Sequence, residues 1–145
     1  MRVDFYQMGA VRPDAITATI ADKICASGAR LLVVAGDEAF LTRLDRQLWD
    51  QDTGGFLPHA LAGGVDDARQ PVLLSTSEDA PNLARNLLIA DGQWREAALS
   101  FDRAFFLFGE DVIEEARLAW KLLSGREGVE RHYWAHDGTR WVKQR

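Results

Sequence analysis

The sequence has very little cysteine and no long apolar stretch, and both absences narrow the class of protein. Cys25 is the only cysteine among 145 residues, so no internal disulfide can form. It lies in an apolar helical pattern, which favours a buried, reduced thiol in a cytoplasmic protein. No secretory signal or membrane-spanning segment is visible, so a membrane protein is not expected. A chain of this length is expected to form one domain, residues 1–145, that needs no disulfide or metal to hold a core.

Positive charge is also scarce, but it is unevenly distributed. The chain has 17 Lys and Arg against 22 Asp and Glu, a formal net charge of −5, which argues against a broad nucleic-acid-binding surface. Residues 117–145 nevertheless hold seven basic and three acidic residues, whereas residues 1–116 hold ten and nineteen. A chain with this distribution can attract an acidic partner to its C-terminal part. The alternative is that the charged end serves solubility alone.

Motifs for catalysis and for metal or cofactor binding are missing. The turn after the first expected strand, residues 9–13, has one glycine and no lysine, so it is neither a dinucleotide fingerprint nor a P-loop. The histidines are His59, His132 and His136; the last two are four residues apart, but the aromatic residues between them predict a strand rather than a zinc-binding helix. No serine lies in a glycine-flanked nucleophile elbow. We therefore expect no cofactor, no metal and no enzymatic activity.

Apolar periodicity predicts alternating strands and helices. The first half indicates a strand at 3–8, a helix at 13–28, a strand at 31–35 and a helix at 37–49. The second half indicates strands at 72–76, 86–90 and 103–108, a helix from 111 to about 124, and an Asp-Gly hairpin or extended segment at 133–141. This order predicts an α/β fold: a three-layer sandwich with a mainly parallel central sheet, Rossmann-like but without the nucleotide fingerprint.

The last predicted helix carries a basic aromatic patch. Trp120 and Lys121 both neighbour Arg117, because residues three and four apart are adjacent on a helix. Two cations beside an aromatic wall suit a peptide that ends in acidic residues, an apolar side chain and a free carboxylate. The periodicity also places Trp120 in the core-facing stripe of the helix, with the cations as a solvated rim. The sequence leaves both interpretations open.

A second apolar segment follows the helix at 37–49. Trp49 comes directly after the last inward-facing leucine, which turns it away from the core. After a glycine-containing break come Phe56, Leu57 and Pro58. Large apolar residues at helix ends and on loops are common interface anchors. The alternative is a hydrophobic plug that closes the core, and His59 is expected to make a structural hydrogen bond.

Several short segments together point to one family. They are the early Phe5-Tyr6 strand and the segments RLDRQLW (43–49), FLPHALAG (56–63), RLAWK (117–121) and GTRW (138–141). With these segments in this order, the chain resembles the chi subunit of bacterial DNA polymerase III over nearly its whole length. The resemblance implies a non-catalytic accessory protein of the clamp-loader complex that acts in DNA replication.

The resemblance also implies two protein partners, with DNA contacted only indirectly. Chi subunits bridge the psi subunit and the acidic C-terminal tail of single-stranded DNA-binding protein. The psi-binding residues correspond here to Trp49, Phe56, Leu57 and Pro58. The tail-binding residues correspond to Arg117, Trp120 and Lys121, with Leu107 as a looser match. Trp120 stands where a tyrosine is more usual, and Leu122-Leu123 stands where further aromatic and basic residues are common.

Two other functions compete with this one. An α/β sheet is compatible with an enzyme that acts on nucleotides or phosphates, although no motif supports it. Trp134, Trp141 and the basic C-terminal residues suit direct binding of single-stranded DNA, since aromatic rings and cations together form stacking platforms.

Overall fold

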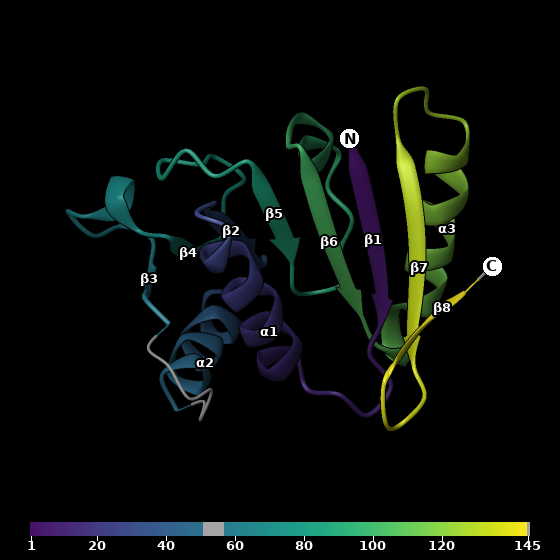
Figure 1. Ribbon diagram of the computed structural model, residues 1–145, viewed down its shortest axis with the longest axis horizontal. Helices are drawn as coiled ribbons and strands as arrows, with labels where there is room; N and C mark the ends of the chain where they lie inside the picture. The colour runs from purple at the N-terminus through teal and green to yellow at the C-terminus, as the bar shows by residue number, and fades with distance from the viewer. Residues whose placement is uncertain (51–56, 145) are drawn as a thin grey trace.

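A computed structural model describes residues 1–50 and 57–144. Within these ranges the chain forms one eight-stranded sheet and three α-helices (Figure 1). The strands are β1 (Arg2–Gln7), β2 (Leu31–Val34), β3 (His59–Leu61), β4 (Val72–Ser75), β5 (Asn86–Ile89), β6 (Arg103–Phe108), β7 (Glu130–His136) and β8 (Trp141–Gln144). The helices are α1 (Pro13–Ala26), α2 (Glu38–Trp49) and α3 (Ile113–Ser124), with short 3₁₀ turns η1 (Asp67–Arg69), η2 (Glu96–Ser100) and η3 (Glu110–Val112).

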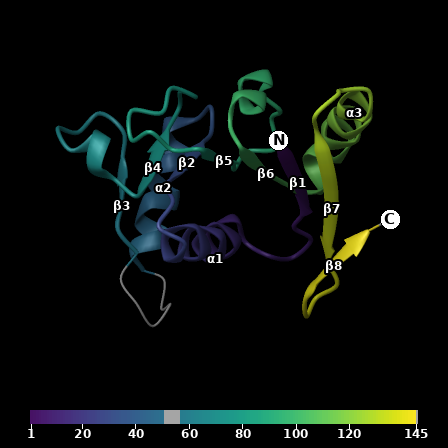
Figure 2. The same cartoon turned by 45° about the horizontal axis from the view of Figure 1, so that its top comes forward.

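The strand order across the sheet is β3-β4-β2-β5-β6-β1-β7-β8. Neighbouring strands run parallel except for the antiparallel pair β7 and β8. Helices α1 and α2 pack on one face of the sheet and α3 packs on the other (Figure 2), so the core consists of two apolar clusters. The predicted three-layer α/β sandwich with a mainly parallel sheet is confirmed.

Local sequence explains where the first two helices begin. Pro13 lies in the first turn of α1, and the isoleucines that repeat every four residues along that helix are buried, as predicted. Helix α2 begins after Asp37, whose carboxylate accepts a hydrogen bond of 2.9 Å from the backbone N–H of Ala39. This cap satisfies one of the free N–H groups of the first turn.

The C-terminal hairpin forms as its sequence indicates. Gly138 has a φ of 98° in the turn, a conformation that favours glycine. The carboxylate of Asp137 accepts hydrogen bonds from the backbone N–H groups of Thr139 and Arg140, both at 2.8 Å. The turn therefore folds β8 back against β7, and both histidines of that segment lie on an extended strand.

Two local details differ from the sequence-based expectation. The segment 56–63 is predicted as a loop, but part of it pairs with β4 as the short strand β3. On α3 the fully buried residues are Ala116, Ala119 and Leu123, whereas Trp120 is only half-buried. The buried stripe of α3 is therefore built from two alanines and a leucine, and the large indole lies at its edge.

Cys25 packs, partly buried, against the core on the α1 side of the sheet. Burial, and secondarily the charge of Asp22, raise the pKa of its thiol, which favours the protonated form at neutral pH. Over the ranges that the structure describes, no helix is both long enough and apolar enough to cross a membrane.

Alternation along the central strands sends neighbouring side chains to opposite faces. Phe5 of β1 packs in the core on the α3 side, whereas Tyr6 packs on the α1 side. On β7, Tyr133 packs on the α3 side, and the next residue, Trp134, stacks against Tyr6. The same strands therefore build two different aromatic surfaces.

Candidate partner-binding surfaces

The predicted basic patch lies on the exposed side of α3, beside a hollow of about 290 Å³. Arg117 and Trp120 of α3 line this hollow together with Tyr133 of β7 and Gln144 of β8, and we call it the α3 hollow. Lys121 is exposed one turn after Arg117 and does not line it. The two hairpin residues are not singled out by any sequence pattern, because only the tertiary fold brings β7 and β8 next to α3.

Trp120 contributes to the core and to the hollow at the same time. Its ring meets Phe5 and Tyr133 edge to face, with centroid distances of 5.2 and 5.6 Å. The guanidinium of Arg131 lies over the indole, 4.0 Å from its centroid, and donates a 2.6 Å hydrogen bond to the Trp120 carbonyl. Trp120 is therefore a core residue on one side and a wall of the hollow on the other. Arg131 and Tyr133 are two residues apart on β7 and so lie on the same face of the sheet. This spacing is the signal that could have identified Arg131 from the sequence.

Arg117 forms an exposed ion pair. Its Nη1 lies 2.8 Å from Oε1 of Glu114, one turn earlier on α3. The two side chains are 63% and 75% exposed. Because exposed pairs contribute little to stability, the carboxylate of a ligand can replace Glu114 at small cost.

Tyr133 forms the wall of the hollow on the β7 side. Its hydroxyl donates a 2.6 Å hydrogen bond to Oε1 of Gln7, which fixes the ring. Burial raises the pKa of this hydroxyl, and the positive charge of Arg117 only partly opposes that effect. The hydroxyl therefore stays a hydrogen-bond donor at neutral pH.

Leu107 does not belong to this surface. It is fully buried on β6 and packs in the core on the α1 side of the sheet, whereas Trp120 packs on the α3 side. Its neighbours Phe106 and Phe108 face α3, and alternation turns Leu107 the other way. The prediction that Leu107 lies near the patch is wrong.

Trp49, at the end of α2, is 50% exposed, as its position after the inward-facing stripe predicts. Its indole lies over the imidazole of His59, with ring centroids 4.2 Å apart. His59 is buried, and its two ring nitrogens lie 2.8 and 3.1 Å from the carbonyl oxygens of Leu57 and Asp45. The expected structural role of His59 is confirmed, and it gives Trp49 a rigid support.

The residues predicted to accompany Trp49 differ from one another. Leu57 is buried and packs in the core on the α1–α2 side, so it is part of a hydrophobic plug that closes the core. Its side chain is not available to a partner. Pro58 is half-buried. Phe56 lies outside the described residues. Trp49 is therefore the predicted residue of this segment that the structure leaves exposed.

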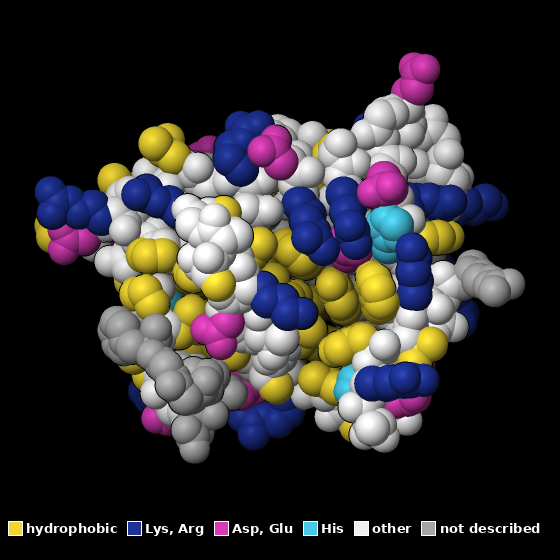
Figure 3. Space-filling model, in the orientation of Figure 1, with side chains coloured by type: hydrophobic (Ala, Val, Ile, Leu, Met, Phe, Trp, Pro, Cys, Tyr) yellow, Lys and Arg dark blue, Asp and Glu magenta, His cyan; other side chains and the backbone are white. Residues whose placement is uncertain are grey.

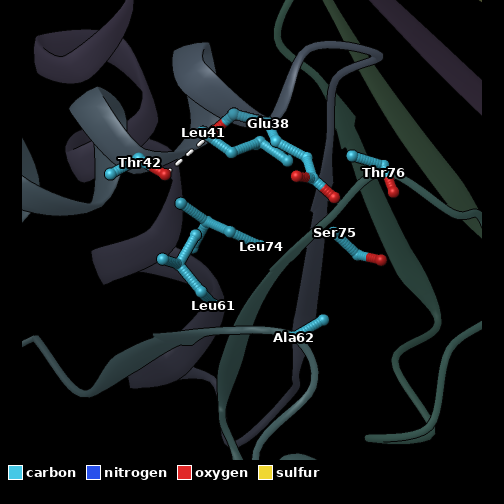
Figure 4. Close-up of a pocket in the computed structure, with 8 residues that line it drawn as sticks. All are labelled: Glu38, Leu41, Thr42, Leu61, Ala62, Leu74, Ser75 and Thr76. Carbon is cyan, nitrogen blue, oxygen red and sulfur yellow. Dashed lines mark hydrogen bonds between the residues drawn. The ribbon is translucent and has the colours of Figure 1, made fainter.

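A pocket of about 280 Å³ lies beyond the ends of β3 and β4, at one edge of the sheet (Figure 4). The carboxylate of Glu38 extends into it toward Ser75 and Thr76, and its lining, all described residues, has no basic side chain. A carboxylate without a cation does not suit a phosphate. Within residues 1–50 and 57–144, no three His, Cys, Asp or Glu side chains are grouped so as to hold a metal ion.

Similarity to known proteins decides the family. The profile of the family described as "DNA polymerase III chi subunit, HolC" matches residues 1–130. The chain belongs to this family. A protein named DNA polymerase III subunit chi from Pseudomonas aeruginosa is 36% identical over 91 residues, which are 61% of this chain and 62% of the relative. Its namesake from Escherichia coli K12 is 34% identical over 64 residues, 44% of each chain. The matches thus span less than two thirds of either relative.

Membership confirms the resemblance read from the short sequence segments. Chi subunits are non-catalytic accessory subunits of DNA polymerase III, and this is the finding that argues against an enzyme. It also supports an accessory role in DNA replication. What each surface binds is a separate question, because these matches name the subunit and not its ligands.

Proposed function

We propose that this chi-family protein is a single-domain adaptor of the replisome. It links the clamp-loader complex, through psi or an equivalent subunit, to the acidic C-terminal tail of single-stranded DNA-binding protein. It needs no cofactor, reaches DNA only indirectly in this role, and acts in the cytoplasm. The observation that carries the proposal is the α3 hollow, where Arg117 stands beside a fixed aromatic wall.

The chemistry of the α3 hollow supports a peptide that ends in an apolar residue with a free carboxylate. Trp120 and Tyr133 offer apolar walls to a terminal aromatic side chain. Arg117 can exchange its exposed partner Glu114 for the terminal carboxylate in a charge-assisted hydrogen bond. Lys121 and Arg131 add positive charge for acidic residues further up the tail. Several tails on one tetramer would multiply a modest affinity.

The exposed indole of Trp49 supports a second, separate surface for psi or its equivalent. A tryptophan that is half-exposed and backed by a buried histidine loses little side-chain freedom on binding, which is the property of an interface anchor. It lies on α2, on the opposite face of the sheet from α3, so the adaptor can hold both partners at once.

The first test is calorimetric titration with the C-terminal peptide of the organism's own single-stranded DNA-binding protein. Arg117→Ala should weaken binding by about 1.5 to 3 kcal/mol, the range for a hydrogen bond to a charged group, or about 10- to 150-fold. Arg85→Ala is the matched control, because Arg85 forms an equally exposed ion pair with Asp102 and does not line the hollow. Equal peptide affinity for wild type and Arg117→Ala would refute the site.

The second test concerns Trp49. Trp49→Ala should weaken capture of a psi-containing clamp-loader complex by about 2 kcal/mol or more, as truncation of an interface anchor does. Peptide titration of the same variant should match wild type, and Val65→Ala, at a fully exposed residue, should change neither. Loss of both interactions in Trp49→Ala would indicate misfolding, and retention of both would exclude Trp49 from the interface.

A further inference from the structure

A second aromatic hollow, of about 440 Å³, lies on the face of the sheet opposite α3. Its floor is formed by β6, β1 and β7, and its sides are α1 and the C-terminal hairpin. Figure 3 shows it as apolar surface sunk between Lys and Arg side chains. We call it the α1 groove. Its volume falls within the roughly 300–1,000 Å³ of small-ligand sites.

Aromatic rings from four strands form the floor of the α1 groove. Tyr6 is stacked between Phe105 and Trp134, at centroid distances of 6.3 and 6.4 Å. Trp141 of β8 meets Tyr6 at 85°, 5.1 Å away. Three of these rings, those of Tyr6, Trp134 and Trp141, are only partly buried. Partly exposed rings at the base of an open hollow are surfaces on which nucleobases stack.

A buried carboxylate anchors Arg103, which lines the groove, and its neighbour Arg2. Asp4 is fully buried, and it accepts hydrogen bonds from Arg2 and Arg103 at 3.0 and 2.9 Å and from the indole N–H of Trp134 at 3.1 Å. The two arginine side chains remain 38% and 34% exposed. Each guanidinium has five N–H donors, so both keep donors for an external anion.

Two lysines extend the positive rim. Lys23 lines the groove from α1, and Lys143 stands on the same face of β8 as Trp141, in register with Trp134. Two acidic residues, Asp4 and Glu130, occupy groove-facing positions of these strands. Asp4 is buried, and the carboxylate of Glu130 lies 3.1 Å from Nε2 of His132. The groove therefore has a positive rim on a protein whose net charge is −5.

We propose that the α1 groove binds a short stretch of single-stranded DNA. One or two bases enter the hollow against Tyr6, Trp134 and Trp141, and the flanking phosphates meet Lys23, Arg103 and Lys143. An unpaired strand has exposed base faces, whereas the bases of a duplex are stacked and paired. The site lies on the opposite face of the sheet from the α3 hollow, so it extends the proposed adaptor role and does not depend on it.

Nucleic acid fits these observations better than an acidic peptide does. Cations stand on both sides of the aromatic floor, on α1 and on the hairpin, which matches a backbone that carries phosphates on both sides of an inserted base. A peptide that ends in one apolar residue would bring its charge to one side only.

The experiment is fluorescence anisotropy of labelled d(T)10 titrated with the full chain at low salt. A second labelled oligomer with the same phosphates but abasic sites in place of bases separates stacking from charge. We expect d(T)10 to bind at least tenfold more tightly than the abasic oligomer, with a log–log salt slope of about −2 from three phosphate contacts. Lys23→Glu and Trp141→Ala should each weaken d(T)10 binding about tenfold.

The control variant is Arg69→Glu, which makes the same charge change on the exposed turn η1, beside the other edge of the sheet. It should leave d(T)10 binding unchanged, and so should Arg117→Ala, whose loss of peptide binding tests the adaptor role separately. Equal binding of d(T)10 and the abasic oligomer would overturn the proposal, as would equal effects of Lys23→Glu and Arg69→Glu. The proposal would also be overturned if d(T)10 did not bind and an acidic tail peptide bound to wild type but not to Lys23→Glu. The groove would then be a peptide site.

Discussion

The two aromatic surfaces of this protein hold their arginines in opposite ways. At the α1 groove, Arg103 of the groove lining and the adjacent Arg2 both pair with Asp4, which is fully buried. In the α3 hollow, Arg117 pairs with Glu114, and both side chains are mostly exposed. The first carboxylate is part of the fold, whereas the second is a surface group that a ligand can displace.

Burial separates the structural charges of this protein from the exchangeable ones. A carboxylate without solvent must keep its partners, because a buried charge that loses them is costly. An exposed carboxylate regains water when its partner leaves, so its loss costs little. The α1 groove therefore presents cations that are already fixed in place. The α3 hollow presents Arg117, whose partner Glu114 carries the same kind of carboxylate as the proposed ligand.

The largest expected effect is on the structural carboxylate. Asp4→Ala should lower the free energy of unfolding by about 3 kcal/mol, because it removes an anion that accepts charge-assisted hydrogen bonds from two arginines. Urea denaturation followed by circular dichroism measures this. Asp102→Ala is the matched control, since its bond to Arg85 is exposed, and it should change stability little. A similar loss in both variants would contradict the distinction between the two kinds of pair.

The pH dependence of stability sharpens the same comparison. Burial alone would raise the pKa of Asp4, but hydrogen bonds from Arg2 and Trp134 and the charge of Arg103 outweigh it and hold the pKa below its usual value. Because the pKa of Asp4 is lower in the folded than in the unfolded protein, its ionised form stabilises the fold at pH values above the unfolded-state pKa, which is near 4. This stabilisation is lost as the pH falls through the folded-state pKa. Asp4→Asn should therefore flatten the acid limb of the stability curve below about pH 4. An unchanged acid limb would count against this role of Asp4.

The smallest expected effect is on the exchangeable carboxylate. Glu114→Gln should strengthen binding of the tail peptide by about 0.2 to 1 kcal/mol, because Arg117 no longer has to leave an ion pair. Titration of wild type and variant at low salt measures the change, and added salt should reduce it. Glu115→Gln, at the next exposed position of α3, is the control for net charge. Weaker peptide binding by Glu114→Gln would mean that Glu114 orients Arg117 for the ligand.

Local patterns predicted most of the elements for a physical reason. Apolar side chains recur with the period of a helix or strand wherever one face is buried, and the Asp-Gly turn has few alternatives to a hairpin. Patterns of this kind also placed Trp49 on the outside of α2 and Arg117 beside Trp120 on α3. They missed β3, because an edge strand of three residues is too short to show a period.

The errors at the sites concern the face to which a side chain turns, and the residues that were missed come from distant parts of the chain. Leu107 was expected near the patch, but alternation within β6 turns it to the other face. Leu57 was expected at a loop surface, but it packs into the core. Tyr133 and Arg131 belong to the surface around Trp120 because β7 pairs with β1, at the other end of the chain. The Tyr133–Gln7 hydrogen bond spans 126 residues.

Patterns along the chain predicted most of the helices and strands and most of the faces that they bury, and the short segments identified the chi family. These properties depend on neighbours along the chain, whose periodicity can be read directly. The cluster of Arg2, Asp4, Arg103 and Trp134 follows from the tertiary fold, as does the division of adjacent β7 residues between two separate surfaces. Strand order and crossovers bring those residues together, and both depend on packing across the whole sheet rather than on any local pattern.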